Sequence, residues 1–345
     1  MASRNRRNRL LALTTAALAA FVAGSPAGAN DSTAVLGAGG LELATTETIS
    51  MDKEDLFISP SEVRVDYVFT NTSDKDVESI VAFPMPEIES YTESEVGIAN
   101  RDSDNFMDFK VEQDGAPIEP QLQQRAIVAD LDVTADLEEQ GIPKYALTAK
   151  AEEAVKKLPE DVVNDWVARG MLMRSSWMEG DKEVTEIRPA WKLRSTYWWR
   201  TVFPAGKSVK VHHSYKPSVG GTVAMTFIQD GKPNDYFADY QKRYCLDDGF
   251  MKAAAKLEQA QKANPDTYYF EKWLSYILMT GNNWAGSIGD FHLTVDKEDP
   301  SAIVSFCGKD VTKTGPTTFE MRAKDFYPEH DLDVLIVYKQ TVEQQ

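Results

Sequence analysis

Long hydrophobic runs are absent from the sequence after residue 29. No later stretch approaches the roughly 20 apolar residues that a membrane-spanning helix needs, so we expect no integral membrane segment in the mature chain. An excess of positive charge is also absent. The 345 residues contain 37 Lys and Arg against 54 Asp and Glu, for a net charge of −17. That balance disfavours nucleic acid as a partner.

Acidic residues are absent from the first 29 positions, which have the three parts of an export signal. The basic part consists of Arg4, Arg6, Arg7 and Arg9. The apolar segment Leu10–Val22 follows, and Ala27-Gly28-Ala29 supplies the small residues of a cleavage site. We predict cleavage near Ala29 and a periplasmic or secreted protein, with the pair Arg6-Arg7 leaving the twin-arginine export route open.

Cysteine is scarce, with only Cys245 and Cys307 in the chain. An even number of cysteines in an exported chain predicts one disulfide, with two buried free thiols as the alternative. The CxxC spacing of zinc sites is missing. The adjacent His212 and His213 would point to opposite faces of a strand, so they cannot easily bind one ion together. We therefore expect no metal site and no cofactor.

Alternating apolar residues predict β-strands over much of the chain. Val63, Val65, Tyr67 and Phe69 alternate with polar residues, which is the period of a half-buried strand, and Val77–Phe83 reads as the next strand. The fold class that we predict is mainly β with a helical insertion (α+β). The architecture that we expect is an antiparallel β-sandwich with two β layers or domains.

Helical spacing marks the middle of the chain. Pro159 separates two predicted helices, and Asp132–Gln140 is predicted to form a short helix before them. A further helix is predicted over Phe250–Lys262, and Trp273–Met279 with Ile288–Val295 resembles a hairpin. The predicted organisation is a signal peptide over 1–29, an N-terminal β-sandwich domain over 30–120, a helical insertion over 121–180 and a C-terminal β-rich domain over 181–345.

Six short motifs of the mature chain form a recognisable set. They are Asn30-Asp31-Ser32, Leu36–Leu41, Asp55–Pro60, Val81–Pro86, Thr280-Gly281-Asn282-Asn283-Trp284 and Val304–Gly308. Together they resemble an exported bacterial family, the domain of unknown function DUF4424. The resemblance covers essentially the whole mature chain and implies a cell-envelope protein, without an activity or catalytic residues to carry over. Over Val63–Pro86 the chain is also similar to VIT domains, which are β-sandwich interaction modules.

Catalytic motifs are incomplete. The pattern Ser50-Met51-Asp52-Lys53, together with Lys313-Thr314-Gly315, resembles penicillin-recognising serine enzymes. The serine of that pattern should begin a buried helix, whereas Ser50 lies among strand-like residues. We assign no catalytic residues and predict that the protein is not an enzyme. A serine hydrolase or transpeptidase-like enzyme acting on the cell wall, with Ser50 and Lys53, is the alternative.

Residues 188–229 contain no Asp or Glu, and alternation sorts their side chains into two faces. Trp191, Leu193, Tyr197, Trp199 and Phe203 share the apolar face of one strand, while Val209, Val211, His213 and Tyr215 share that of the next. If the two strands pair with their apolar faces together, the remaining face carries five cations, one Trp and one His. This predicted basic face consists of Lys192, Arg194, Trp198, Arg200, Lys210, His212 and Lys216.

Such a face suits an anionic glycan, a lipid headgroup or an acidic protein, because Arg binds carboxylates and phosphates bidentately and Trp packs under cations or on sugar rings. The alternative is internal: the basic face docks against the acidic helices of residues 130–169. The function that we expect is a non-enzymatic binding or scaffolding module of the bacterial cell envelope.

Overall fold

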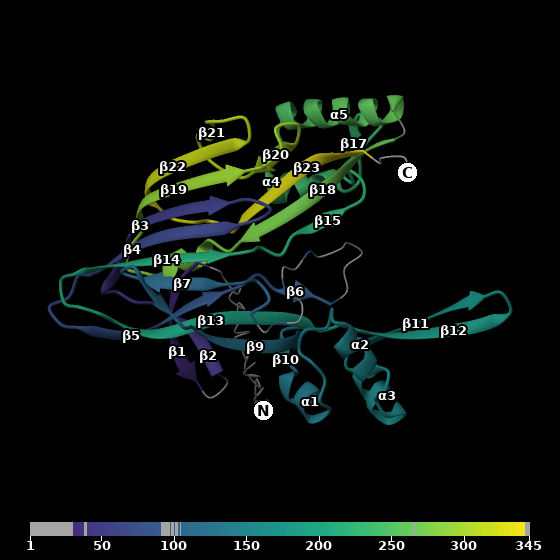
Figure 1. Ribbon diagram of the computed structural model, residues 1–345, viewed down its shortest axis with the longest axis horizontal. Coiled ribbons are helices and arrows are strands. Elements are labelled where there is room, and N and C mark those ends of the chain that lie inside the picture. The colour runs from purple at the N-terminus through teal and green to yellow at the C-terminus, as the bar shows by residue number, and fades with distance from the viewer. Residues whose placement is uncertain are drawn as a thin grey trace, which may run out of the picture.

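The computed structural model describes residues 30–341 apart from 38–39, 91–96, 98–99, 101–102, 104 and 265. Residues 1–29, which contain the predicted export signal, lie outside the described residues, so cleavage near Ala29 stays a prediction. The described chain is mainly β, as predicted, and Figure 1 shows its sheets stacked in layers with helices at the periphery. None of its helices is long and apolar enough to cross a membrane.

The larger sheet has eight strands. Their order is β21 (Thr312–Lys313), β22 (Thr318–Phe326), β19 (Ile288–Asp296), β3 (Ile49–Ile58), β4 (Val63–Asn71), β14 (Ser208–Tyr215), β7 (Lys110–Gln113) and β8 (Ala116–Ile118). Neighbours are antiparallel except β3 and β19, which run parallel. Strand β19 comes from the last fifth of the chain, so this sheet is closed by contacts between distant parts of the sequence.

The second sheet has seven strands. Their order is β10 (Leu131–Asp132), β9 (Gln121–Val128), β13 (Lys192–Phe203), β5 (Val77–Pro84), β1 (Ser32–Gly37) and β2 (Gly40–Ala44), with β6 (Ile88–Glu89) also paired to β13. All of these pairs are antiparallel. Strand β13 is the longest in the sheet and lies between β9 and β5, so its side chains are divided between an inner and an outer face.

The main core lies between these two sheets. The predicted alternation is confirmed: Val63, Val65, Tyr67 and Phe69 of β4 are at most 1% exposed. They pack in one cluster with inward side chains of the seven-stranded sheet, such as Phe83. The sandwich architecture is therefore present, since apolar residues at every second position bury one face of each sheet.

The predicted domain boundaries at residues 120 and 181 do not separate the sheets from one another. The eight-stranded sheet joins β3, β4, β7 and β8 of the N-terminal region to β14, β19, β21 and β22 of the C-terminal region. The seven-stranded sheet likewise inserts β13 between β5 and β9. Local alternation identifies strands but not their partners, so the predicted boundaries missed this interleaving.

The helices of the middle segment are α1 (Thr134–Glu139), α2 (Ala149–Val155) and α3 (Glu160–Ala168), with Pro159 capping α3 where the break was predicted. They form a smaller core around Trp191, whose Nε1–H donates to the Lys144 carbonyl at 2.7 Å. The following hairpin, β11 (Leu172–Glu179) and β12 (Lys182–Pro189), projects from the body of the molecule in Figure 1.

A third sheet lies near the C-terminus, in the order β15 (Gly220–Thr222), β18 (Thr267–Tyr276), β23 (Leu332–Thr341) and β20 (Ile303–Phe306). Helix α5 (Asp248–Ala263), predicted over residues 250–262, packs against it, after α4 (Phe237–Tyr244) and the short strands β16 (Ile228–Gln229) and β17 (Lys232–Pro233). The predicted disulfide is present between Cys245 and Cys307, which joins the end of α4 to the residue after β20.

The predicted hairpin of residues 273–295 is wrong. Strand β18 belongs to the third sheet, whereas β19 belongs to the eight-stranded sheet. The 3₁₀ turn η1 (Met279–Asn283) carries the chain from one to the other. The glycine-rich motif that follows β18 is therefore a crossing point between sheets, and it lies against the beginning of the described chain.

Candidate functional site

The predicted basic face is divided between the two sheets. The apolar faces of β13 and β14 do come together, but as facing layers of the sandwich and not as neighbours in one sheet. Strand β13 pairs with β5 and β9, whereas β14 pairs with β4 and β7. The side chains opposite the core therefore point away from each other, on the two outer surfaces. This corrects the predicted single surface of seven residues.

On the seven-stranded sheet, two of the predicted cations are paired with acids. Lys192 Nζ lies 2.9 Å from Glu89, and Arg194 Nε donates to Glu87 at 2.7 Å. The hydrogen bond to Glu89 raises the pKa of Lys192, with partial burial acting in the opposite direction. The internal alternative that we considered also needs correction, because these acids follow β5 and do not come from helices α1–α3.

Arg200 and Trp198 lie further along the same outer face. Trp198 is half-buried against a small apolar cluster of Ala34, Ile80 and Ala82. Arg200 is exposed, and no ion pair or side-chain hydrogen bond joins it to another of the described residues. It lines a groove of about 700 Å³ formed by β1, β5, β13 and the residues after β2. The groove is therefore the place on this sheet where a cation is available to a ligand.

The other three residues of the predicted face lie on the eight-stranded sheet. His212 Nδ1 is 2.9 Å from Asp66 Oδ1, and Lys216 Nζ is 2.8 Å from Asp108 Oδ2. The Lys210 ammonium is exposed and has no acidic partner among the described residues. Only Lys210 in this group thus matches Arg200 as an unpaired cation, and it lies on the opposite side of the sandwich.

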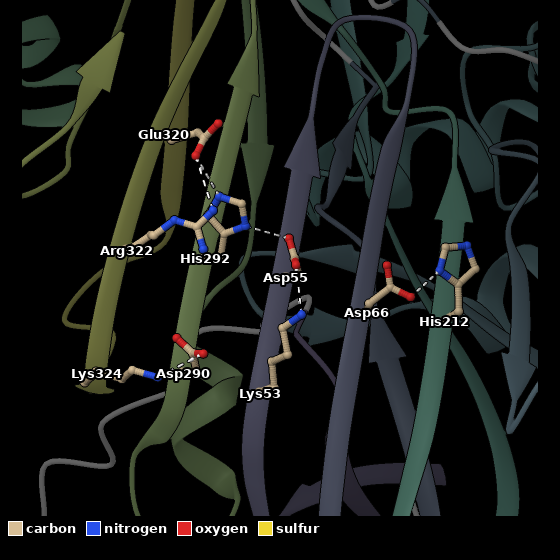
Figure 2. Close-up of polar contacts among 9 residues, drawn as sticks. All are labelled: Lys53, Asp55, Asp66, His212, Asp290, His292, Glu320, Arg322 and Lys324. Carbon is tan, nitrogen blue, oxygen red and sulfur yellow. Dashed lines mark hydrogen bonds and ion pairs between the residues drawn. The ribbon is translucent and has the colours of Figure 1, made fainter. Parts of the chain in front are cut away.

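Figure 2 shows why this outer face is not a basic surface: charges of both signs alternate across neighbouring strands. His292 of β19 lies between two carboxylates, with Nδ1 2.9 Å from Asp55 and Nε2 3.2 Å from Glu320. Lys53 pairs with Asp55 from the other side at 3.0 Å. Both ring nitrogens of His292 are occupied, so this side chain is held in place by cross-strand pairing.

The electrostatic effect of this network is seen at Asp55. Partial burial acts to raise the pKa of Asp55, but the hydrogen bond from Lys53 and the charge of His292 outweigh it and lower the pKa. Lys324 and Asp290 make a further cross-strand pair at 2.9 Å. No group of three or more ligating side chains within the described residues is arranged to hold a metal ion. Chemically, the face offers surface charges that are already paired with each other, and exposed pairs of this kind contribute little to stability.

A third arrangement of titratable groups was missed in the sequence because it lies inside the sandwich. We call it the buried polar cluster. It consists of Asn30, Asp31, Glu54, Tyr67, His213, Tyr276 and Thr280, and none of them is more than 5% exposed. The side-chain amide of Asn30 donates to Glu54 at 2.9 Å, and the Tyr67 hydroxyl donates to Asn30 Oδ1 at 2.6 Å. The phenol oxygens of Tyr67 and Tyr276 are 2.8 Å apart.

Burial controls the protonation of this cluster. It raises the pKa of Glu54 to about 8, although hydrogen bonds from Asn30 and Tyr276 act to lower it. Burial, and after it the charge of Glu54, raises the pKa of Asp31, while burial lowers the pKa of His213. His213 Nε2 lies 3.6 Å from Asp31 Oδ1, too far for a hydrogen bond.

One signal in the sequence could have located Glu54. It occupies the same alternating positions as Leu56 and Ile58, which predicts an inward side chain. For His213, alternation did place the ring on the apolar face of β14, and the structure buries it completely. Nothing in the local sequence marks Asp31, since its burial depends on residues about 250 positions away.

The residues of the alternative hydrolase lie on β3. The Ser50 hydroxyl donates to Asp52 at 2.7 Å, and Lys53 is paired with Asp55 as described above. No hydrogen bond joins Ser50 to Lys53 in the described structure, and Ser50 begins no helix. Lys53 as a paired, partly exposed ammonium is poorly suited to act as a base. The structure therefore adds no support to this alternative.

The interleaved sheets and their buried polar cluster define a β-rich sandwich protein with a peripheral helical segment. The chain belongs to the family described as domain of unknown function DUF4424, whose model matches residues 29–335. This confirms the predicted family. The likeness of residues 63–86 to VIT domains stays a prediction. No curated protein gives a significant match.

Solved structures give distant similarities only. A Legionella pneumophila protein provisionally described as nutrient binding has a TM-score of 0.41 and 15% identity, over 90% of this chain and 70% of that one. An M1 zinc metallopeptidase from Deinococcus radiodurans has a TM-score of 0.26 and 8% identity, over 85% of this chain and 43% of its own. The chain thus spans less than half of that peptidase.

Proposed function

We propose that this protein is exported and acts in the bacterial cell envelope as a non-enzymatic binding or scaffolding module, whose groove at Arg200 takes an anionic glycan. Export is supported by the sequence of residues 4–29, with its basic, apolar and small-residue parts. It is also supported by the disulfide between Cys245 and Cys307, since disulfides persist in oxidising compartments outside the cytoplasm.

The observation that carries the proposal is the position of Arg200. Of the cations that we predicted on β13, Lys192 and Arg194 are paired with acids, whereas Arg200 lines an open groove. Glu78 also lines the groove, but it forms no ion pair with Arg200 within the described residues. A guanidinium without a carboxylate partner favours an anionic ligand group, which it can bind through two parallel hydrogen bonds.

A glycan suits the rest of the groove better than a lipid headgroup or an acidic peptide. Five hydroxyl side chains line it: Thr33, Thr45, Thr46, Ser79 and Thr201. The Thr33, Ser79 and Thr201 hydroxyls already donate within the protein, so their oxygens serve as acceptors for the O–H groups of a sugar. Exposed apolar side chains, Val35, Leu36 and Val202, provide surface for the carbon face of a sugar ring. Pockets with a few polar groups on an apolar lining are typical of small-ligand sites.

The test compares two single substitutions that remove the same charge from opposite sides of the sandwich. Arg200→Gln removes the groove cation, and Lys210→Gln is the matched control on the eight-stranded sheet. We expect binding to a polyuronate glycan, measured by isothermal titration calorimetry, to weaken at least about tenfold in Arg200→Gln, the loss expected for one charge-assisted hydrogen-bonding group. Lys210→Gln should bind like the parent protein.

Other outcomes identify other ligands or reject the groove. Vesicles rich in phosphatidylglycerol and a polyglutamate peptide serve as parallel probes, and preference for either would reject a glycan. Equal loss of binding in both variants would show non-specific charge attraction. Unchanged binding in Arg200→Gln would remove the groove from the proposal.

A further inference from the structure

The first described residues are held deep inside the protein. Asn30, Asp31 and Ser32 are completely buried, although chain ends are normally exposed unless contacts hold them in place. Asn30 would be the first residue of the mature chain if cleavage follows Ala29. The structure therefore buries the segment that export processing would turn into a terminus.

The contacts of Asn30 come from the motif after β18. The Thr280 hydroxyl accepts a hydrogen bond from the Asn30 backbone N–H and donates one to the Asn30 carbonyl, both at 2.7 Å. A Cβ atom at Gly281 would lie 2.8 Å from the Asn30 side-chain nitrogen, so only glycine fits there without a shift. Two motifs 250 residues apart, at Asn30 and at Thr280-Gly281, are thus in close contact.

The next two residues are held by the same motif. Trp284 Nε1–H donates to the Asp31 carbonyl at 2.6 Å, and the Asn283 side-chain amide donates to the Ser32 hydroxyl at 2.8 Å. The indole of Trp284 in turn packs on Phe69, with ring centroids 4.3 Å apart. The main-chain position of Asn30 is therefore fixed from several sides.

The buried polar cluster contains two acids, and among the described residues no Lys or Arg compensates them. Asp31 and Glu54 are both fully buried, and neither is paired with a Lys or Arg within the described residues. The nearby imidazole of His213 is completely enclosed by aromatic rings, which favours its neutral form. Both carboxylate oxygens of Asp31 lack a hydrogen-bond partner. Buried carboxylates are costly unless a positive charge or hydrogen bonds compensate them.

We propose that cleavage after Ala29 supplies the missing cation, because the α-ammonium group of Asn30 is the charge that completes the buried polar cluster. This inference rests on the proposed export. Hydrolysis of the Ala29–Asn30 bond by a signal peptidase consumes one water molecule. The carboxylate leaves on Ala29, and the new amine of Asn30 takes up a proton. An amide with one N–H is thereby replaced by an ammonium with three N–H donors.

The consequence is that cleavage after Ala29 completes the charge compensation of the buried polar cluster and so stabilises the fold. One N–H of the ammonium keeps the hydrogen bond to Thr280, and the others become available to the acids of the cluster. An opposite charge in a buried site favours the ionised carboxylate, so Glu54 changes from a group that prefers its proton to the partner of the new terminus. A chain that keeps even one residue before Asn30 has no charge at this point.

The test compares two proteins that differ by one residue. The Asn30 chain begins at Asn30, and the Ala29 chain, its matched control, begins at Ala29. At neutral pH we expect the Asn30 chain to melt at least about 3 °C higher. Glu54→Gln should lower the melting temperature of the Asn30 chain and should not lower that of the Ala29 chain. Equal melting temperatures together with equal effects of Glu54→Gln would overturn the proposal.

A second measurement covers the case in which Glu54→Gln fails to fold. An amine-reactive reagent is applied to the native and the unfolded Asn30 chain, and labelling of the first residue is followed by mass spectrometry. We expect at least about tenfold slower labelling in the native protein, because reaction requires an opening of the fold. Equal rates would show an exposed terminus and would also overturn the proposal.

Both measurements use purified protein, so neither depends on export or on a ligand. Export is tested separately by the N-terminal sequence of the protein recovered from cells. A chain that still carries residues 1–29 there would reject the proposed export while leaving the result on the two purified chains unaffected.

Discussion

Replacing Glu54 by Gln should change how stability depends on pH. Glu54 is fully buried between the sheets, where its carboxylate accepts a hydrogen bond from the Asn30 amide at 2.9 Å and one from Tyr276 at 3.4 Å. In the Ala29 chain, where the Asn30 nitrogen is a neutral amide, burial raises the pKa of Glu54 from 4.5 to about 8. Glutamine keeps the shape and one acceptor oxygen but never ionises.

The raised pKa fixes the sign and size of the effect. Between pH 4.5 and about 8 the native chain keeps a proton that the unfolded chain releases. The stability that Glu54 contributes is therefore complete below the lower value and is lost as the pH rises through the higher one. The interval between the two pKa values, 4.5 and about 8, corresponds to a loss of about 5 kcal/mol in the free energy of unfolding, at roughly 1.4 kcal/mol for each pH unit.

Urea unfolding followed by tryptophan fluorescence measures most of this loss at a series of pH values from about 5 to about 8.5. As the pH rises, we expect the free energy of unfolding of the Ala29 chain to fall relative to that of its Glu54→Gln variant. The variant should therefore be the more stable protein at the alkaline end of the series. The titration of Asp31 and His213 is common to both and cancels to first order. Parallel curves for the two proteins would refute the reasoning. In the Asn30 chain the dependence of this difference on pH should largely disappear, because the α-ammonium holds Glu54 in its ionised form, and Glu54→Gln should lower the stability throughout the pH series.

Two further predictions concern the disulfide and the surface pairs. Replacing Cys245 and Cys307 together by Ser should lower the free energy of unfolding by about 4 kcal/mol, because the bond closes a loop of 62 residues; a urea midpoint equal to that of the oxidised parent would contradict this. Arg194→Gln should cost less than about 1 kcal/mol, since its pair with Glu87 is partly exposed, and should leave polyuronate binding unchanged. If calorimetry showed that Arg194→Gln weakens polyuronate binding as much as Arg200→Gln does, Arg194 would instead belong to the ligand site.

Local sequence patterns predicted correctly which side chains of a strand point into the core, but they did not predict which strands pair with each other. The inward positions of Tyr197, Trp199 and Phe203 on β13 follow from alternation, and all three are at most 3% exposed. The same alternation does not state whether β13 lies beside β14 or across the core from it, because both arrangements bury the same side chains. That choice depends on the pairing of β13 with β5 and β9.

The candidate sites show the same limit. Lys192 and Arg194 are cations in a segment without acids, but Glu87 and Glu89 reach them through the pairing of β6 with β13. Arg200 lies opposite Ile80 on the neighbouring strand, and no ion pair joins it to an acid among the described residues. Net charge in a window of sequence therefore did not predict which cation is free.

The amino-acid sequence alone determined the β-rich class, the helices on both sides of Pro159, the disulfide and the family, because each depends on local periodicity or on short motifs. Only the tertiary structure decided that strands from both ends of the chain share the eight-stranded sheet, that the basic residues lie on opposite surfaces, and that Asn30 meets Glu54 and Thr280 inside the core. Those outcomes depend on contacts between segments up to 250 residues apart. Such contacts are selected by the packing of the whole molecule, and no local pattern encodes them.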